Sequence, residues 1–430
     1  LALFVLMGLW PFLITERITY EDATDDTRKL LADISLESMN QTAIWEKLSV
    51  IALVRPEGDI LPVRTHFGVE RNVWNIGLCE LKSRTPFWYT LPDVIASKLL
   101  TSKSPRIMKA IRFKPIGEQG ELSSIDIVGG IHVSKNENLI QKLVESRSLK
   151  KKERDKQSNK PALSERLDRE QEALKTIANS ISYGIFIEVN TEEQEESVGV
   201  YGLDAFRSNA SKKEIFGRYF HPIVAALLTS GARLMVAVAE AWLKEHRGYY
   251  AFCDTDSLAV SPNHWMKLQE FFEPLNPFST GDRLLKLEKE NYDRRGNLID
   301  PWFYGISAKR YVLFRYENGE PEPVKWSSHG LGHLIRNEEN WEKKLWRNIL
   351  RYALGRITKE DLLSDYSGQY AVSKLVVSTA HVMKRIATLN RGKKYCGRVK
   401  PFNFVCVGQP CVIGQERKLV HPMTSFADPR

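Results

Sequence analysis

The stretch FCDTDSLAV, residues 252–260, sets two carboxylates, Asp254 and Asp256, with one residue between them in an otherwise apolar, strand-like run. In an extended or hairpin backbone, side chains two positions apart project to the same face, so the two carboxylates converge. Neighbouring carboxylates must share a proton or bind cations. Magnesium fits this ligand set, because it takes carboxylate oxygens and keeps places for phosphate oxygens. A surface turn rich in aspartate is the alternative, which the apolar flanks disfavour.

A second group of polar side chains lies upstream in QEALKTIANSISYG, residues 171–184. Lys175 and Asn179 are four positions apart and share a helix face, whereas Tyr183 drifts partly around the helix. A lysine, an amide and an aromatic ring on one stripe can hold a triphosphate at one end and stack beneath a base pair at the other. An ordinary amphipathic helix is the alternative.

A basic helix is predicted before it, in the segment from residue 138 that ends in SLKKKERDKQSNK. Arg147 and Lys151 are four positions apart there, so they can grip phosphate oxygens through charge-assisted hydrogen bonds. A solvated charged face is the alternative. With Ser164 as N-cap and Gly184 as terminator of the following helix, the two helices form an antiparallel hairpin.

The rest of the chain reads as a mixture of helices and strands, so the fold class is α+β. Residues 1–134 predict a sheet-on-helix layer, with the apolar residues 1–14 as a buried helix or strand too short to cross a membrane. Residues 184–202 alternate like a β-hairpin with an acidic tip. Residues 221–247 predict a helix stopped by Gly248, which leads into the strand that carries the aspartates. Beyond about residue 330 the sequence is mostly helical.

The overall charge favours a polyanionic partner. The chain has 430 residues, enough for two or three domains, with 62 Lys and Arg against 53 Asp and Glu and a formal charge of +9. Lys309 and Arg310 flank a strand that could follow a nucleic-acid backbone, and residues 381–400 hold seven Lys or Arg and no acid. The five scattered cysteines fit neither a disulfide framework nor a zinc site, which indicates a reducing compartment such as the cytoplasm.

Taken in order, ALKTIANSISYG, FCDTDS and SAKRY resemble motifs of the family B DNA polymerases. FCDTDS is similar to motif C, YxDTDS, with Phe252 in place of the tyrosine. ALKTIANSISYG is similar to motif B, KxxxNSxYG, and SAKRY to the thumb-proximal KKxY element. The resemblance covers roughly residues 135–315. It implies a right-hand polymerase, with palm at 1–134 and 201–306, fingers at 135–200 and thumb at 307–430.

The resemblance also implies a reaction and its residues. A DNA-directed DNA polymerase extends a primer 3′-hydroxyl on primer-template DNA from a deoxynucleoside triphosphate (dNTP), using two Mg²⁺ ions. Asp256 is then a direct metal ligand, and Asp254 supports the same site. Primer-template DNA is held by Lys309, Arg310 and Tyr311. The implied nucleotide-binding residues are Arg147, Lys151, Lys175, Asn179, Tyr183 and Gly184.

The sequence departs from the family pattern in two places. Motif A, DxxSLYP, supplies a second metal ligand in the family and does not occur here; Asp33 in LADISLESM and Asp93 in LPDVIASKL match it only partly. We therefore expect motif A to lie upstream of residue 1. Motif B carries one extra residue, NSISYG, which rotates Tyr183 by about 100° relative to Lys175 unless a local bulge absorbs it.

Two other functions remain open at this point. Nucleotide-sugar glycosyltransferases also carry an Asp-x-Asp sequence after a strand, where it binds manganese, but they need neither the Lys/Asn/Tyr helix nor the basic C-terminal part. A degenerate or truncated chain could bind DNA without extending it. Salt-dependent affinity for primer-template DNA separates the first alternative from a polymerase, and primer extension separates the second.

Overall fold

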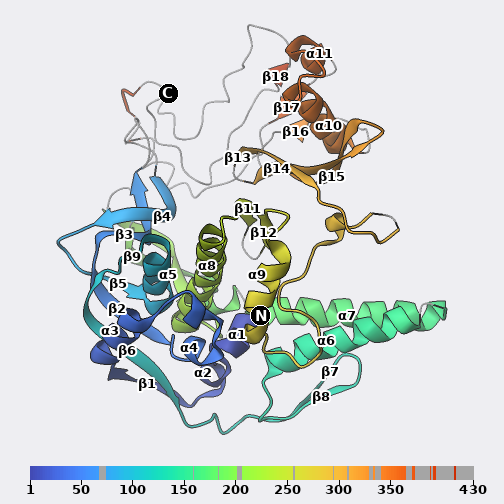
Figure 1. Ribbon diagram of the computed structural model, residues 1–430. Coiled ribbons are helices and arrows are strands. Elements are labelled where there is room, and N and C mark those ends of the chain that lie inside the picture. The colour runs from blue at the N-terminus through green and yellow to red at the C-terminus, as the bar shows by residue number, and fades with distance from the viewer. Residues whose placement is uncertain are drawn as a thin grey trace. The chain divides into compact units, whose positions relative to one another are not determined.

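The computed structural model has an α+β fold that divides into two compact units, one formed by residues 1–63 and 78–286 and the other by residues 64–77 and 287–430 (Figure 1). The structure describes residues 1–66, 74–157, 159–182, 184–200, 206–254, 257–293, 295–307, 309–328, 333–334, 340–364, 370–372, 388, 391–393 and 411–412. The predicted α+β class is thus confirmed. The four-part division into palm, fingers and thumb remains a prediction, because compactness alone does not distinguish those parts.

A four-stranded antiparallel sheet organises the first unit. Its strands lie in the order β1 (Arg17–Asp22), β6 (Arg106–Ile116), β2 (Val50–Arg55) and β5 (Phe87–Thr90). In β2 every second side chain is buried, at Val50, Ala52 and Val54, as expected for a strand with one face on the core. A separate pair joins β3 (Glu57–His66) to β4 (Trp74–Lys82).

Helices supply the rest of this core and confirm the predicted sheet-on-helix layer. The segment 1–14 is buried as α1 (Ala2–Leu6) and α2 (Trp10–Ile14), as predicted. The predicted long helix is α8 (Pro222–Glu245), and it packs on α5 (Leu91–Thr101). Smaller helices of this unit are α3 (Thr24–Asp33), α4 (Thr42–Trp45), α9 (Trp265–Phe272), η1 (Glu37–Asn40), η2 (Ile185–Ile187) and η3 (Glu273–Leu275).

Helix α8 is the one described helix that is long and apolar enough to cross a membrane, with 44% of its most apolar window buried inside the protein. Core helices of water-soluble proteins pass the same test. The buried face of α8, which includes Leu227, Leu234 and Val238, belongs to the main hydrophobic core.

The predicted helical hairpin is present as α6 (Leu139–Lys156) and α7 (Pro161–Ser182), which extend side by side from the sheet-and-helix body of the first unit (Figure 1). The two helices share a small core of Leu143, Leu174 and Ala178, beside the short strands β7 (Ile125–Ile127) and β8 (Ile131–Val133). The predicted N-cap at Ser164 is wrong, because α7 already begins at Pro161. Proline suits this first position, since its fixed φ is helical and its missing N–H has no partner there.

The predicted β-hairpin within residues 184–202 is also wrong. The acidic residues lie along one long strand, β9 (Val189–Val200), which pairs with β10 (Phe206–Phe216). In this register Glu192 is opposite Lys213 and Glu193 is opposite Lys212. Opposite charges across an antiparallel pair are favourable, so the acidic run is better placed against a basic strand than at a tip.

The second unit contains the sheet β13 (Trp302–Ser307), β14 (Arg310–Glu317) and β15 (Glu320–Ser328), with α10 (Trp341–Ala353) packed on it. Its buried cluster is Val312, Phe314, Trp346 and Leu350. The predicted helical character beyond residue 330 holds for α10 and α11 (Lys359–Ser364) and fails at 370–372, which form a strand. Its remaining elements are η4 (Lys289–Asn291), β16 (His333–Leu334), β17 (Tyr370–Val372) and β18 (Cys411–Val412).

Candidate nucleotide and metal site

Asp254, the first of the two aspartates, ends the first strand of a β-hairpin. Strands β11 (Tyr250–Asp254) and β12 (Ser257–Val260) are antiparallel, and their last paired residues are Asp254 and Ser257. The predicted strand before the aspartates is therefore confirmed. The apolar flanks, which seemed to disfavour a turn, belong to the two paired strands. The side chain of Asp254 and the whole of Asp256 lie outside the described residues, so their convergence stays a prediction.

The chain turns at the end of α8 and enters the β11–β12 hairpin. The amide of Gly248 donates to the carbonyl of Leu243 at 2.7 Å, and the amide of Arg247 donates to that of Lys244 at 3.2 Å. This is a Schellman ending, in which Arg247 takes the left-handed position with φ of 58°. A Cβ on Gly248 would lie 2.9 Å from Leu243 and 3.0 Å from His264. The predicted stop at Gly248 thus has a steric basis, namely the space needed where the chain leaves the helix.

Polar contacts fix the other end of the hairpin. The Ser261 hydroxyl lies 2.7 Å from Nδ1 of His264 and accepts the amide of Tyr249 at 3.2 Å. Nε2 of His264 donates to the carbonyl of His246 at 3.1 Å, so Nδ1 accepts the serine hydroxyl proton. The His246 ring stacks on Trp242 with centroids 4.0 Å apart. These contacts hold the base of β11 and β12 on the end of α8.

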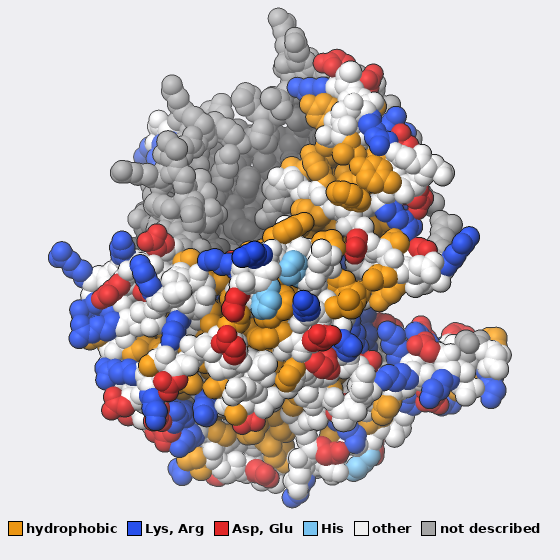
Figure 2. Space-filling model, in the orientation of Figure 1, with side chains coloured by type: hydrophobic (Ala, Val, Ile, Leu, Met, Phe, Trp, Pro, Cys, Tyr) orange, Lys and Arg blue, Asp and Glu red, His pale blue; other side chains and the backbone are white. Residues whose placement is uncertain are grey.

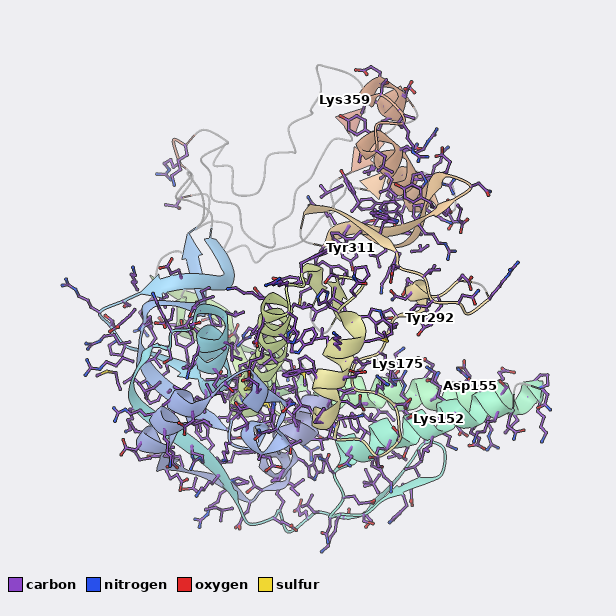
Figure 3. All side chains as sticks on the ribbon, in the orientation of Figure 1. Lys152, Asp155, Lys175, Tyr292, Tyr311 and Lys359 are labelled. Carbon is purple, nitrogen blue, oxygen red and sulfur yellow. The ribbon has the colours of Figure 1, made fainter. Side chains whose placement is uncertain are left out.

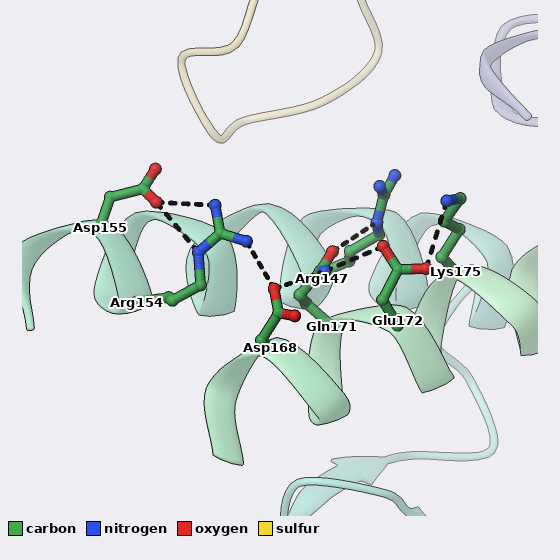
Figure 4. Close-up of polar contacts among 7 residues, drawn as sticks. All are labelled: Arg147, Arg154, Asp155, Asp168, Gln171, Glu172 and Lys175. Atoms are coloured by element: carbon green, nitrogen blue, oxygen red, sulfur yellow. Dashed lines mark hydrogen bonds and ion pairs between the residues drawn. The ribbon is translucent and has the colours of Figure 1, made fainter. Parts of the chain in front are cut away.

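The helical hairpin brings Arg147 and Lys175 into one polar network (Figure 4). Nε of Arg147 donates to Oε1 of Gln171 at 3.4 Å, and Nε2 of Gln171 donates to Oε1 of Glu172 at 3.0 Å. Nζ of Lys175 reaches Oε2 of Glu172 at 3.2 Å. Arg147 and Lys175, which the sequence placed on different helices, are therefore linked through Gln171 and Glu172.

Sequence reasoning missed Glu172. The hydrogen bond from Gln171 and then that from Lys175 lower the pKa of its carboxyl below the ordinary value, and the charge of Arg147 adds to this. Glu172 is consequently ionised at neutral pH and partly neutralises the two cations. A triphosphate approaching Arg147 and Lys175 must displace it or bind beside it.

The remaining nucleotide-site candidates have different surroundings. Lys151 is exposed one turn beyond Arg147, and Asn179 is exposed one turn beyond Lys175. Gly184, with φ of 72°, follows the end of α7, as its predicted terminator role requires. Helix α7 is regular from Lys175 to Ser182, so no bulge in that stretch absorbs the extra motif residue. Tyr183 itself lies outside the described residues.

The predicted DNA-binding residues lie in the second unit, at the turn between β13 and β14. Lys309 is exposed with φ of 59°, and its carbonyl accepts the Ser327 hydroxyl at 2.8 Å. Arg310 begins β14 and is half-buried. Tyr311 is only 8% exposed, and its ring centre lies 5.7 Å from that of Phe303. Tyr311 therefore packs within the sheet and offers little surface, while most of the basic segment 381–400 lies outside the described residues.

The partial motif A matches have ordinary structural settings. The buried carboxylate of Asp93 accepts two hydrogen bonds from Arg233, at 2.8 and 2.9 Å, and one from the Thr90 hydroxyl at 3.0 Å. These bonds tie α5 to α8 and occupy both carboxylate oxygens. Asp33 is the exposed last residue of α3. Asp93 is thus engaged in an ion pair that supports the core.

The Asp93–Arg233 pair gives a stability prediction. We expect Arg233→Ala to lower the free energy of unfolding by about 2 kcal/mol, because it leaves a buried carboxylate without its guanidinium. The cost is below that of a fully buried pair, since the Arg233 side chain is 38% exposed and partly screened by water. Urea denaturation measures it, with Lys244→Ala on the exposed end of α8 as control. Equal stability of both variants would show that the pair contributes nothing.

Within the described part of the chain, no three His, Cys, Asp or Glu side chains are grouped to hold a metal, and Asp256 lies outside that part. Neither a protein-family model nor a curated protein sequence matches this chain.

Proposed function

We propose that this chain belongs to a DNA-directed DNA polymerase of the family B type, which adds nucleotides from dNTPs to a primer 3′-hydroxyl. The observation that carries the proposal is the meeting of Arg147 and Lys175 in one network on the α6–α7 hairpin. Such a cationic pair suits the phosphates of a nucleotide. The order of the three sequence motifs and the β-hairpin whose first strand ends at Asp254 support the same function.

The proposed roles follow from the chemistry of each side chain. The carboxylates of Asp254 and Asp256 would hold Mg²⁺, since both are hard oxygen donors separated by a single residue in the sequence. Bound Mg²⁺ would lower the pKa of the primer hydroxyl and neutralise charge on the leaving pyrophosphate. Lys175, Arg147 and Lys151 would orient the triphosphate through charge-assisted hydrogen bonds.

Other residues would contact the base pair and the DNA. Asn179 would position the nucleotide, with Tyr183 and Gly184 beneath the nascent base pair. Lys309 and Arg310 would contact DNA phosphates, and the buried ring of Tyr311 would support their turn rather than touch DNA over a large area.

The proposed architecture is a right hand. The sheet-and-helix body and the β11–β12 hairpin would form the palm, residues 1–134 and 201–306. The segment 135–200, with α6 and α7, would be the fingers, and residues 307–430 the thumb. The antiparallel pairing of α6 and α7 supports the fingers assignment, because it presents polar side chains of both helices together.

Binding to primer-template DNA is the first test. We expect affinity to fall steeply with salt, by roughly a thousandfold or more between 50 and 200 mM if six or more phosphates are contacted. Fluorescence anisotropy with a labelled primer-template measures this, and addition of dNTPs and Mg²⁺ should then extend the primer. Affinity that does not change with salt would contradict a polymerase and favour a small-substrate enzyme such as a glycosyltransferase.

A further inference from the structure

A pocket of about 420 Å³ lies between α6 and the segment 277–286. One stripe of α6 docks that segment: both the amide and the hydroxyl of Ser279 donate to Oε1 of Glu145, at 2.9 and 3.0 Å. Nζ of Lys152 donates to the carbonyl of Thr280. The α6 residues of this docking stripe are Gln141, Glu145, Ser148 and Lys152.

Three further α6 residues line the pocket, each one position before a residue of the docking stripe, namely Val144, Arg147 and Lys151, and Asp155 lines it near the end of the helix. Ser148 and Lys152 of the docking stripe line it as well. Arg283 and Lys286 line the pocket from the docked segment. Two elements more than 100 residues apart in sequence thus present cations to one pocket. Of the residues that line the pocket from α6, Lys152 and Asp155 are labelled in Figure 3.

The cations of this pocket outnumber its carboxylates. Five cationic side chains line it, namely Arg147, Lys151, Lys152, Arg283 and Lys286, against Asp155 and Asp282. Asp282 is shared between Lys286 at 3.4 Å and Lys152 at 3.8 Å, and Asp155 pairs with Arg154 at 2.8 Å. Among the described residues, no carboxylate lies within 4 Å of the cationic atoms of the other three.

Asp282 keeps its charge in this setting. Burial raises the pKa of its carboxyl, but the hydrogen bond from Ser148 and the charges of Lys286 and Lys152 outweigh burial and lower it below the ordinary value. Even with Asp282 ionised, the pocket retains a net positive charge. An anion entering it gains several N–H donors. It competes there with the hydrogen bond from Arg283 to Gln269 at 2.6 Å, with that from Arg147 to Gln171 at 3.4 Å, and with the partly exposed ion pairs of Asp282.

We propose that this pocket binds a chain of two or three linked phosphoryl groups, with Lys152, Arg283 and Lys286 completing a site that Arg147 and Lys151 begin. Its volume suits a small ligand, and phosphate oxygens match the clustered N–H donors. This inference rests on the proposed function. The bound phosphoryl groups would come either from the triphosphate of a dNTP or from free inorganic polyphosphate such as released pyrophosphate. The surface of the α6–α7 hairpin carries both acidic and basic side chains (Figure 2). The pocket differs from that surface in its excess of cationic side chains.

Calorimetric titration of the full chain with sodium tripolyphosphate, without metal or DNA, tests the proposal. We expect Lys151→Ala and Lys286→Ala each to weaken binding about tenfold, since each removes one charge-assisted hydrogen bond. Both side chains are mostly exposed, so folding should survive, which thermal denaturation checks. Lys103→Ala removes the same charge from an exposed loop and should bind like the unaltered chain. No binding by the unaltered chain, or equal weakening in all three variants, would overturn the proposal.

Competition distinguishes the two sources. If dATP displaces tripolyphosphate, the pocket takes the phosphates of the nucleotide; if both bind together, it takes free polyphosphate. Either result supports the site when Lys151→Ala and Lys286→Ala weaken tripolyphosphate binding. If the chain binds tripolyphosphate in this manner but does not extend a primer, the result supports the phosphate-binding pocket and contradicts the polymerase function.

Discussion

Replacing Asp256 with asparagine is expected to lower the rate of primer extension by roughly a thousandfold or more. The amide keeps the size of the carboxylate but removes the charge that would bind Mg²⁺ directly. Loss of a ligand that supplies about 4 kcal/mol of transition-state stabilisation corresponds to a factor of that size. Single-nucleotide extension under saturating dNTP measures the effect.

The matched control for Asp256→Asn is Asp25→Asn. Asp25 is an exposed aspartate in the first turn of α3 that pairs with Arg28 at the surface. We expect this variant to extend primers at the unaltered rate. If Asp256→Asn retained more than a tenth of the activity, the acidic pair would not hold the catalytic metal.

Lys175→Ala is expected to reduce kcat/KM for the dNTP by about 100-fold. This is the effect of removing one hydrogen-bond donor that stabilises negative charge developing in a transition state. Lys175 is partly exposed and pairs with Glu172 on the surface of α7, so its amine can turn to a phosphate with little cost to the fold. Steady-state extension over a range of dNTP concentrations separates the effects on kcat and KM.

Two variants on the same helix control for this change. Arg169→Ala removes a cation from an exposed pair with Glu165, and we expect no effect on kinetics. Glu172→Gln removes the carboxylate that competes with phosphate for Lys175, and the apparent affinity for dNTP should rise or stay constant. A Lys175→Ala chain with unchanged kcat/KM would show that α7 does not bind the triphosphate.

Elements with strong local signals were predictable from the sequence. Helix α8 has a continuous apolar face and a terminator, Gly248, whose replacement would collide with Leu243 and His264. The α6–α7 hairpin has two helical patterns joined by a short polar turn. In each case the signal lies within the element, so periodicity and terminators suffice.

Features that depend on distant residues were not predictable in this way. The acidic strand β9 pairs with the basic strand β10, and the alternation of β9 alone does not reveal that partner. Asp93 resembles part of a catalytic motif, yet its partner Arg233 is 140 positions away. The pocket beside α6 likewise depends on a segment more than 130 residues downstream that docks through Ser279 and Asp282.

The central claim is that Asp254 and Asp256 bind divalent cations together. Titration of the full chain with Mn²⁺, followed by electron paramagnetic resonance of the free ion, tests it without requiring catalysis. We predict that the unaltered chain binds Mn²⁺ and that the double variant Asp254→Asn/Asp256→Asn binds it at least tenfold more weakly, because both charged oxygen ligands are lost. Equal Mn²⁺ binding by the two chains would contradict the account.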